Sequence, residues 1–337
     1  MMVIRPIAAS DLKPLLALAK QSGLGITTLP ADKGILTEKI QLSMESFAKQ
    51  VVSPANEYYL FVMEDVRYQK IVGCCALKAA VGQVWPFYSY KLSRLSQKNQ
   101  ELHIDKEIQL LNLVNDYQGA TELCSLLLAP DARVKNNGKY LSLSRFLFMG
   151  QQPTRFADNV MAEIRGYVDD EGHSPFWRAV GKHFFGIDFP RADHLSGIGK
   201  KQFIADLMPQ YPVYVNLLPE AAQAVIGQAH AQSRAAKAFL EKQNLQYTGY
   251  VDIFDAGPCV EAPMEKVRAI KNQKCVRIVE VKPSQSLQHY LVATTGEQFR
   301  CAGGHIDEYP DGTVALPQDL LTTLQVDKGD IVTILQV

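Results

Sequence analysis

Residues 122–149 form the stretch that most constrains how this chain can fold. Residues 123–128 are a short, mostly apolar run that ends just before a proline, which predicts a buried strand. Residues 131–138 are polar and basic and contain two asparagines and a glycine, which is typical of a tight loop. Apolar residues then recur at helical spacing, so we expect a helix that begins near Lys139. A strand, a loop of exposed N–H groups and a helix N-terminus together favour binding of a phosphate or pyrophosphate.

The loop sequence narrows the kind of phosphate ligand. The chain has neither the Gly-x-x-x-x-Gly-Lys-Ser/Thr string of P-loops nor the Gly-x-Gly-x-x-Gly string of dinucleotide folds. It contains Arg133, Asn136 and Gly138 at a spacing that resembles the Arg/Gln-x-x-Gly-x-Gly/Ala loop of GNAT-type N-acyltransferases, which holds the pyrophosphate of coenzyme A. Asn136 departs from the glycine of that loop, but asparagine tolerates left-handed backbone angles better than most other residues. A basic loop that binds no ligand is the alternative interpretation.

Composition and charge exclude several classes of function. The chain has 337 residues, 47% of them hydrophobic, which allows one large or two ordinary domains. Its 35 basic and 35 acidic residues cancel, which argues against a nucleic-acid-binding surface. No apolar run approaches 18 residues and the N-terminus lacks the apolar core of a signal peptide, so we expect no membrane span and a cytoplasmic protein. The six cysteines form no Cys-x-x-Cys pair, which predicts free thiols and no metal site.

The order of predicted elements gives the loop its context. Residues 1–80 have the order β-α-α-β-β, followed by an insertion at 82–120 and then by the strand-loop-helix. That order resembles the N-terminal half of a GNAT-type acyltransferase, so we expect an α/β (α+β) fold with a mixed sheet, in which residues 1–150 bind the acyl-CoA. Residues 151–262 would complete this core, and two helix-to-strand units within them predict a degenerate second acyltransferase-like half. Residues 263–337 contain short strands and turns and predict a small β-rich module with a structural role.

Longer strings between residues 1 and 262 resemble the bacterial arginine N-succinyltransferases. They include Phe176-Trp177, Val225-Ile-Gly-Gln-Ala-His230 and Tyr250-Val-Asp-Ile-Phe-Asp-Ala-Gly-Pro258. That family transfers succinyl from succinyl-CoA to the α-amine of arginine, the first step of arginine breakdown through succinylated intermediates. Some members use ornithine, and some assemble from two related subunits. The resemblance therefore implies succinyl-CoA as co-substrate and either a homo-oligomer or pairing with a paralogous subunit.

The reaction needs a group that moves protons, since the amine must lose one and the CoA thiolate must be protonated or tolerated. His230 lies in a loop just before a predicted helix N-terminus, whose dipole disfavours the imidazolium and allows proton exchange near neutral pH. The resemblance gives the same histidine a proton-donor role. A covalent route through Cys124 is the alternative, but this thiol lies in a buried strand without a basic partner in the sequence, so we favour direct attack by the amine.

Binding of the two substrates needs further groups. Backbone N–H groups around residues 125–128 would face the thioester and pantetheine, and the resemblance gives Leu126 a contact with succinyl-CoA. The acyl-CoA candidates are Leu126, Leu128, Arg133, Lys135, Asn136, Asn137, Gly138 and Lys139. Arginine requires a carboxylate for its guanidinium, and each of the two substrate carboxylates requires a cation. Charged residues on or beside the expected strands supply candidates for these roles, although each could equally be a surface or capping charge. They are Glu163, Arg165, Asp252 and Asp255.

Two other functions compete with an arginine succinyltransferase. The first is an acyltransferase of the same fold that acts on ornithine or another amine, such as a polyamine. The second is a CoA-responsive regulator that uses its C-terminal module, which the lack of a basic surface disfavours.

Overall fold

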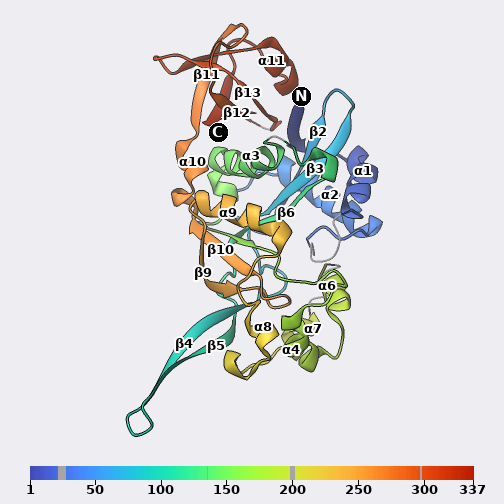
Figure 1. Cartoon of the computed structure of the whole chain (residues 1–337). Helices are drawn as coiled ribbons and strands as arrows, with labels where there is room; N and C mark the ends of the chain where they lie inside the picture. Colours follow the sequence, from blue (N-terminus) through green and yellow to red (C-terminus); the bar gives the residue numbers. More distant parts are fainter. Residues whose placement is uncertain (22–27, 135, 198–201, 297) are drawn as a thin grey trace.

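The computed structural model describes residues 1–21, 28–134, 136–197, 202–296 and 298–337. One long mixed sheet runs through the elongated molecule, and helices cover its faces (Figure 1). Among the described residues its strands follow the order β14-β15-β11-β16-β12-β13-β1-β2-β3-β6-β7-β10-β9-β4-β5-β8. The mixed α/β fold predicted from the sequence is confirmed.

The N-terminal elements follow the predicted β-α-α-β-β order. They are β1 (Met2–Pro6), α1 (Leu12–Ala19), α2 (Lys33–Ala48), β2 (Tyr58–Asp65) and β3 (Lys70–Lys78). Asp32 caps α2 by accepting a hydrogen bond from the Ile35 N–H at 2.9 Å. The first six residues of β2 are all buried, because α2 covers one face of this strand and α3 packs on the same sheet.

The stretch singled out in the sequence folds as strand, loop and helix. It contains β6 (Thr121–Leu128), a 3-10 turn (Pro130–Ala132) and α3 (Asn137–Gln151). The helix begins two residues before the predicted Lys139. Residues 140–149 of α3 are all buried, because the core sheet and the C-terminal strands cover this helix from different sides. Helix α3 is therefore a central element of the core rather than a surface helix.

Residues 151–262 complete the same sheet. Strand β7 (Asn159–Glu163) pairs in parallel with β6, and β10 (Pro258–Pro263) and β9 (Gln246–Val251) follow it. Within the described residues these strands extend one sheet, because β10 pairs antiparallel with the whole of β7. The degenerate second acyltransferase-like half stays a prediction.

A helical insertion lies between β7 and β9. Its elements are α4 (Pro175–Ala179), α5 (Gly181–Phe185), α6 (Phe189–Gly197), α7 (Gln202–Leu207), β8 (Val213–Tyr214), α8 (Glu220–Gln223) and α9 (Arg234–Lys242). The buried Trp177 ring stacks on Phe185 and on Phe254, with centroids 5.1 and 5.6 Å away. Its Nε1 also donates to the Ile187 carbonyl at 2.9 Å. Stacked rings and a satisfied indole fix the insertion against the loop that follows β9.

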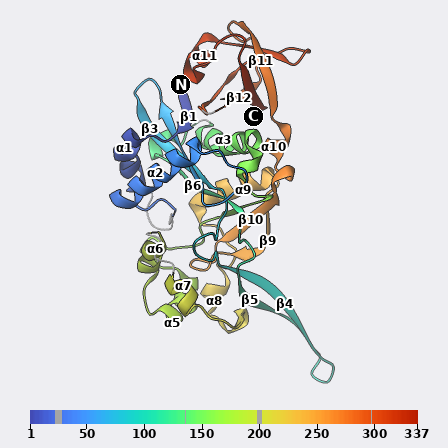
Figure 2. The same ribbon diagram turned by 180° about the vertical axis from the view of Figure 1, so that it is seen from behind.

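The other insertion is a ribbon of β4 (Ser89–Asn99) and β5 (Ile104–Val114) that projects from the body (Figures 1 and 2). Lys98 pairs with the directly opposed Asp105, and Arg94 pairs diagonally with Glu107, which lies opposite Ser96. Both ion pairs lie on one face of the ribbon, because alternate residues of a strand share a face. Strand β9 joins the base of the ribbon to the sheet, and β8 pairs with β5 as the edge strand.

In the C-terminal module, the described residues from Lys274 onward form six strands and one helix, after the short helix α10 (Arg268–Asn272). They are β11 (Lys274–Val281), β12 (His289–Thr294), β13 (Cys301–His305), β14 (Asp307–Glu308), β15 (Thr313–Leu316), α11 (Gln318–Leu324) and β16 (Ile331–Gln336). The sheet is continuous with the core, because Val3 and Ile4 of β1 pair with Ala302 and Cys301 of β13. Tyr140 of α3 also hydrogen-bonds to the ring of His289, with Oη 3.1 Å from Nε2.

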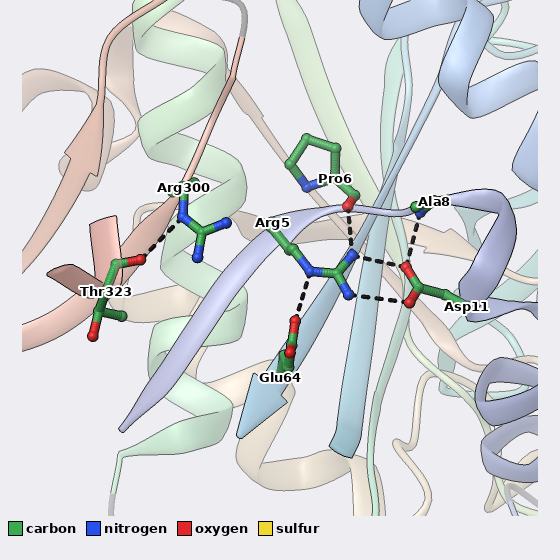
Figure 3. Close-up of polar contacts among 7 residues, drawn as sticks. All are labelled: Arg5, Pro6, Ala8, Asp11, Glu64, Arg300 and Thr323. Atoms are coloured by element: carbon green, nitrogen blue, oxygen red, sulfur yellow. Dashed lines mark hydrogen bonds and ion pairs between the residues drawn. The ribbon is translucent and has the colours of Figure 1, made fainter. Parts of the chain in front are cut away.

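A cluster of charges around Arg5 joins the start of the chain to β2 (Figure 3). The guanidinium donates to both carboxylate oxygens of Asp11, at 2.7 and 3.0 Å, and to Glu64 at 2.7 Å. Asp11 also accepts from the Ala8 N–H at 2.8 Å. Hydrogen bonds to Asp11 raise the pKa of Arg5 despite its partial burial. This bidentate pair fixes the turn between β1 and α1.

We expect Arg5→Met to lower the free energy of unfolding by about 2–3 kcal/mol, because it leaves the buried Asp11 carboxylate without a cation. Urea unfolding measures the change. Lys182→Met is the control, since it breaks the exposed Lys182–Asp188 pair and should cost less than about 1 kcal/mol. Equal losses in the two variants would contradict a structural role for the Arg5 cluster.

Candidate active site

The site begins where β6 and β7 separate. The two parallel strands pair only at Thr121↔Val160 and Glu122↔Met161, and beyond these positions they diverge. A cavity of about 600 Å³ occupies the opening. Its walls come from β6, the first turns of α3, the end of β7, α9 and the loop after β9. Polar strand edges and apolar side chains therefore face one elongated space, as small-molecule sites usually require.

A bulge in β6 lines this cavity. Ser125 has a φ of 54°, and the β3–β6 register shifts beside it. A left-handed conformation costs a non-glycine residue about 1–2 kcal/mol. Hydrogen bonds offset this cost: the Ser125 N–H donates to Thr28 Oγ1 at 3.2 Å, and its hydroxyl lies 3.2 Å from the Tyr58 hydroxyl. Such a bulge redirects backbone groups that would otherwise continue the ladder.

The loop between β6 and α3, here called the anion loop, closes one end of the cavity. Leu126, Leu128, Arg133, Gly138 and Lys139 all line it. The Arg133 Nε donates to the Leu128 carbonyl at 3.2 Å, so the guanidinium is held beside the strand end. The first turn of α3 thus contributes both a glycine and a cation to this wall, which are features that anion sites at helix N-termini use.

The two asparagines of the loop brace it. Asn136 has a φ of −104°, so the loop does not use the left-handed angle that its motif position suggested. Its amide donates to the Tyr140 hydroxyl at 3.2 Å, and the buried Asn137 amide donates to the Ala132 carbonyl at 3.0 Å. Neither side chain is among those that line the cavity. Lys135 lies outside the described residues.

His230 lies at the edge of the site, half-buried. Its backbone N–H donates to the Arg165 carbonyl at 2.8 Å. Gln232 and Ser233, two and three residues further along the chain, line the cavity, although His230 itself does not. Its Nδ1 accepts from the Gln232 N–H at 3.3 Å, which leaves the hydrogen of a neutral ring on Nε2. Burial lowers the pKa of His230, and the Arg165 guanidinium lowers it further. The imidazole is therefore mostly neutral at neutral pH.

Glu163 and Arg165 lie at the end of β7 and line the same cavity. Arg165 has a buried Nε without a hydrogen-bond partner among the described residues. Burial lowers its pKa, while the charges of Asp255 and Asp193 act in the opposite direction. A guanidinium remains charged at neutral pH even so, and it can therefore receive an anionic group.

Asp252 and Asp255 line the cavity from the loop after β9, but both also hold that loop together. Asp252 accepts from the backbone N–H of Phe254 at 2.7 Å. The buried Asp255 accepts from the N–H groups of Gly166 and Gly257 at 2.7 and 2.8 Å. A Cβ at either glycine would lie within 3.0 Å of Asp255 atoms, so the close approach needs glycine there. Burial and the neighbouring Asp252 raise the pKa of Asp255.

The environment of Cys124 disfavours covalent catalysis. The thiol is buried beside the cavity, and burial raises its pKa to about 11. It is therefore protonated at neutral pH and a poor nucleophile. Direct attack by the amine is the route that this arrangement favours.

Sequence reasoning missed several residues of the site. Thr28, Phe189, Asp193 and the α9 residues Ala235, Ala236 and Phe239 line the cavity from three separate parts of the chain. Glu122, Ser142 and Arg145 also line it. The one available signal was Arg145, a charged residue inside an otherwise apolar helical run.

No helix among the described residues has the length and apolarity needed to cross a bilayer. No group of three or more His, Cys, Asp or Glu side chains within these residues is placed to hold a metal ion.

Strands that separate, a bulge beside the opening and a loop before a helix N-terminus form the arrangement that the resemblance to GNAT-type N-acyltransferases led us to expect. Residues 2–269 match the family described as arginine N-succinyltransferase beta subunit, and residues 274–336 match its C-terminal domain. The chain is 40% identical over 339 residues to an arginine N-succinyltransferase of Escherichia coli (strain 55989 / EAEC), covering 100% of this chain and 98% of the relative. This protein belongs to the arginine N-succinyltransferase family.

Other similar proteins also have arginine succinyltransferase names. The arginine N-succinyltransferase of Escherichia coli O139:H28 (strain E24377A / ETEC) is 44% identical over 286 residues, which is 85% of this chain and 83% of the relative. The solved structure of arginine/ornithine succinyltransferase subunit AI from Pseudomonas aeruginosa is 36% identical, with a TM-score of 0.90, and covers 100% of this chain and 98% of that chain.

We expect Arg165→Met to raise the pKa of His230, because it removes a positive charge that disfavours the imidazolium. An NMR titration of the free protein measures this, with His230→Gln to assign the signal. Arg277→Met, in the C-terminal module, is the control and should leave the titration unchanged. An unchanged or lower pKa in Arg165→Met would show that the two side chains do not interact.

Proposed function

We propose that this protein transfers the succinyl group of succinyl-CoA to the α-amine of L-arginine, with direct attack of the amine on the thioester. One observation carries the proposal: a single cavity joins the anion loop of α3 to the bulge of β6 and to the charged groups of β7 and the Asp252–Asp255 loop. Family membership supports the same reaction.

The anion loop would hold the pyrophosphate of CoA. Arg133, Lys139 and the N-terminus of α3 supply positive charge there, while Leu126 and Leu128 offer apolar contact to the pantetheine. Lys135, Asn136 and Asn137 complete the proposed set, the two asparagines by bracing the loop. The bulge at Ser125 would leave backbone N–H groups of β6 facing the thioester carbonyl, where an oxyanion develops.

The arginine substrate would bind at the other wall. Arg165 would receive its α-carboxylate, and Glu163 with Asp252 would supply negative charge for its guanidinium. Asp255 would contribute to this site by holding the loop that carries Asp252. His230 would take part in proton transfer: its lowered pKa keeps the ring neutral, and its Nε2–H would donate a hydrogen bond to the developing thiolate while the proton released by the attacking amine goes to that sulfur. In a protonated ring Nδ1 would carry a hydrogen that faces the Gln232 N–H, so the two donors would repel each other.

Ornithine is the second candidate substrate, because the solved relative from Pseudomonas aeruginosa is named for both amino acids. The same names and the family description mention subunits, which supports a homo-oligomer or pairing with a paralogous chain. The free cysteines, five of them buried, fit a protein of the reducing cytoplasm.

The purified protein should release free thiol from succinyl-CoA when L-arginine is added. Ornithine, lysine and spermidine in parallel reactions reveal the preferred amine. Turnover with arginine well above that with the others supports the proposal. Absence of thiol release with every amine would refute an N-acyltransferase, and a clear preference for ornithine would replace arginine in the proposal.

His230→Ala should lower kcat by about 10²–10⁴-fold, the usual contribution of a positioned proton-transfer group, with little change in the Kd for CoA. Steady-state kinetics and calorimetry measure the two quantities. Because the pKa of His230 lies below 6.5, its contribution to kcat/KM should be constant above that pH and decline only below it. His194→Ala, in α6, is a control with the same change of side chain. Full activity of His230→Ala would remove this histidine from the mechanism.

A further inference from the structure

Arg145 is a buried cation without an anionic partner. Its side chain belongs to α3, and the residue is only 2% exposed. Among the described residues its guanidinium donates two hydrogen bonds, from Nη2 to Ser142 Oγ at 2.9 Å and from Nε to the Ser142 carbonyl at 3.4 Å. Both acceptors are neutral and lie on the same helix. A guanidinium has five N–H donors, so most of its capacity is not used by these contacts.

The contrast with Arg5 shows how this chain otherwise stabilises a buried arginine. Arg5 is held by the carboxylates of Asp11 and Glu64 (Figure 3). Arg145 is more deeply buried, yet no ion pair of the described residues includes it. Burial of a charge without a partner is strongly unfavourable, so such a residue is rarely kept for packing alone.

The titratable groups whose charges would act on Arg145 are also neutral. Burial lowers the pKa of Arg145, and ionised thiols of Cys75 and Cys124 would raise it. Burial raises the pKa of these thiols to about 12 and about 11, so neither is an anion at neutral pH. Glu122 lines the same cavity, but Lys78 already pairs with it. The guanidinium therefore has no counter-charge within the described residues.

The position of Arg145 along the cavity is informative. Gly138, Lys139, Ser142 and Arg145 line it from one face of α3. Arg145 is seven residues beyond Gly138, which is about 10 Å along a helix. Strand β6 ends just before the same loop. The bulge at Ser125 lies three residues before the end of this strand, which places it about 10 Å from the loop as well. Arg145 thus lies at the depth of the bulge, beside Cys124, and away from the anion loop.

We propose that Arg145 binds the free carboxylate of the acyl group, and so selects a dicarboxylic acyl-CoA over a monocarboxylic one. This inference rests on the proposed function, since the thioester carbonyl must lie at the β6 bulge. The carboxylate of a succinyl group lies two methylenes beyond that carbonyl, and it would reach a cation that the fold leaves without a partner. Arg165, at the end of β7, remains available for the carboxylate of the amine substrate.

The proposal is tested with Arg145→Met, which keeps much of the volume and removes the charge. Each variant is assayed with L-arginine and either succinyl-CoA or butyryl-CoA, which has a similar chain and no carboxylate. We expect kcat/KM for succinyl-CoA to decrease by about 100-fold or more, because the acyl carboxylate becomes buried and unpaired. The value for butyryl-CoA should stay within about threefold or increase, and the Kd for free CoA should not change. Where butyryl-CoA turnover is too slow, its inhibition constant against succinyl-CoA replaces kcat/KM.

Two controls separate this proposal from its alternatives. Arg300→Met removes a half-buried arginine that donates to the Thr323 carbonyl at 3.0 Å and lies away from the cavity, so both acyl-CoAs should react as in the unaltered protein (Figure 3). Arg145→Lys should recover part of the preference for succinyl-CoA. Equal losses for both acyl-CoAs, a weaker Kd for CoA, or no change in the ratio would overturn the assignment. Failure of the unaltered protein to react with succinyl-CoA and any amine would instead refute the proposed function.

Discussion

The separation of β6 from β7 after Glu122 is the constraint on which the site depends. Two parallel strands that begin paired and then diverge leave backbone N–H and C=O groups without a ladder partner, and such groups need another one. A substrate with amides along its length can satisfy them, as the pantetheine arm of CoA would. The bulge at Ser125, the anion loop and the end of β7 all obtain their positions from this divergence.

Helix α3 links that opening to the stability of the whole protein. It begins at the anion loop, contributes one face to the cavity, and is buried on its remaining sides by the sheet and the C-terminal strands. A helix packed in this way cannot shift without disturbing the core, so its groups are held rigidly toward the substrate. Pre-organised groups of this kind reduce the reorganisation that catalysis would otherwise require.

Local sequence patterns identified the elements that their own residues determine. The apolar run before Ala129-Pro130 and the polar loop after it were sufficient to predict β6 and α3. Partners distant in the chain were not predictable in this way. The helix-to-strand units of 151–262 showed that strands exist, but not that they would pair with β7. The sequence identified Asp255 as a charged residue. It could not predict that the N–H groups of Gly166 and Gly257 donate to its carboxylate, because the fold brings them together. Part of the covered surface of α3 packs against β12 and β13, which lie more than a hundred residues later.

The pairing of β1 with β13 has a consequence for how the chain is made. Val3 and Ile4 are synthesised well before their partners Ala302 and Cys301, because about 300 residues separate the two strands in the sequence. During translation one edge of β1 therefore has no native neighbour until those residues have been made. Contacts so distant in sequence form slowly, and an unpaired strand edge is prone to association with other chains. Nascent chains of this protein thus have a long interval in which a chaperone could protect that edge.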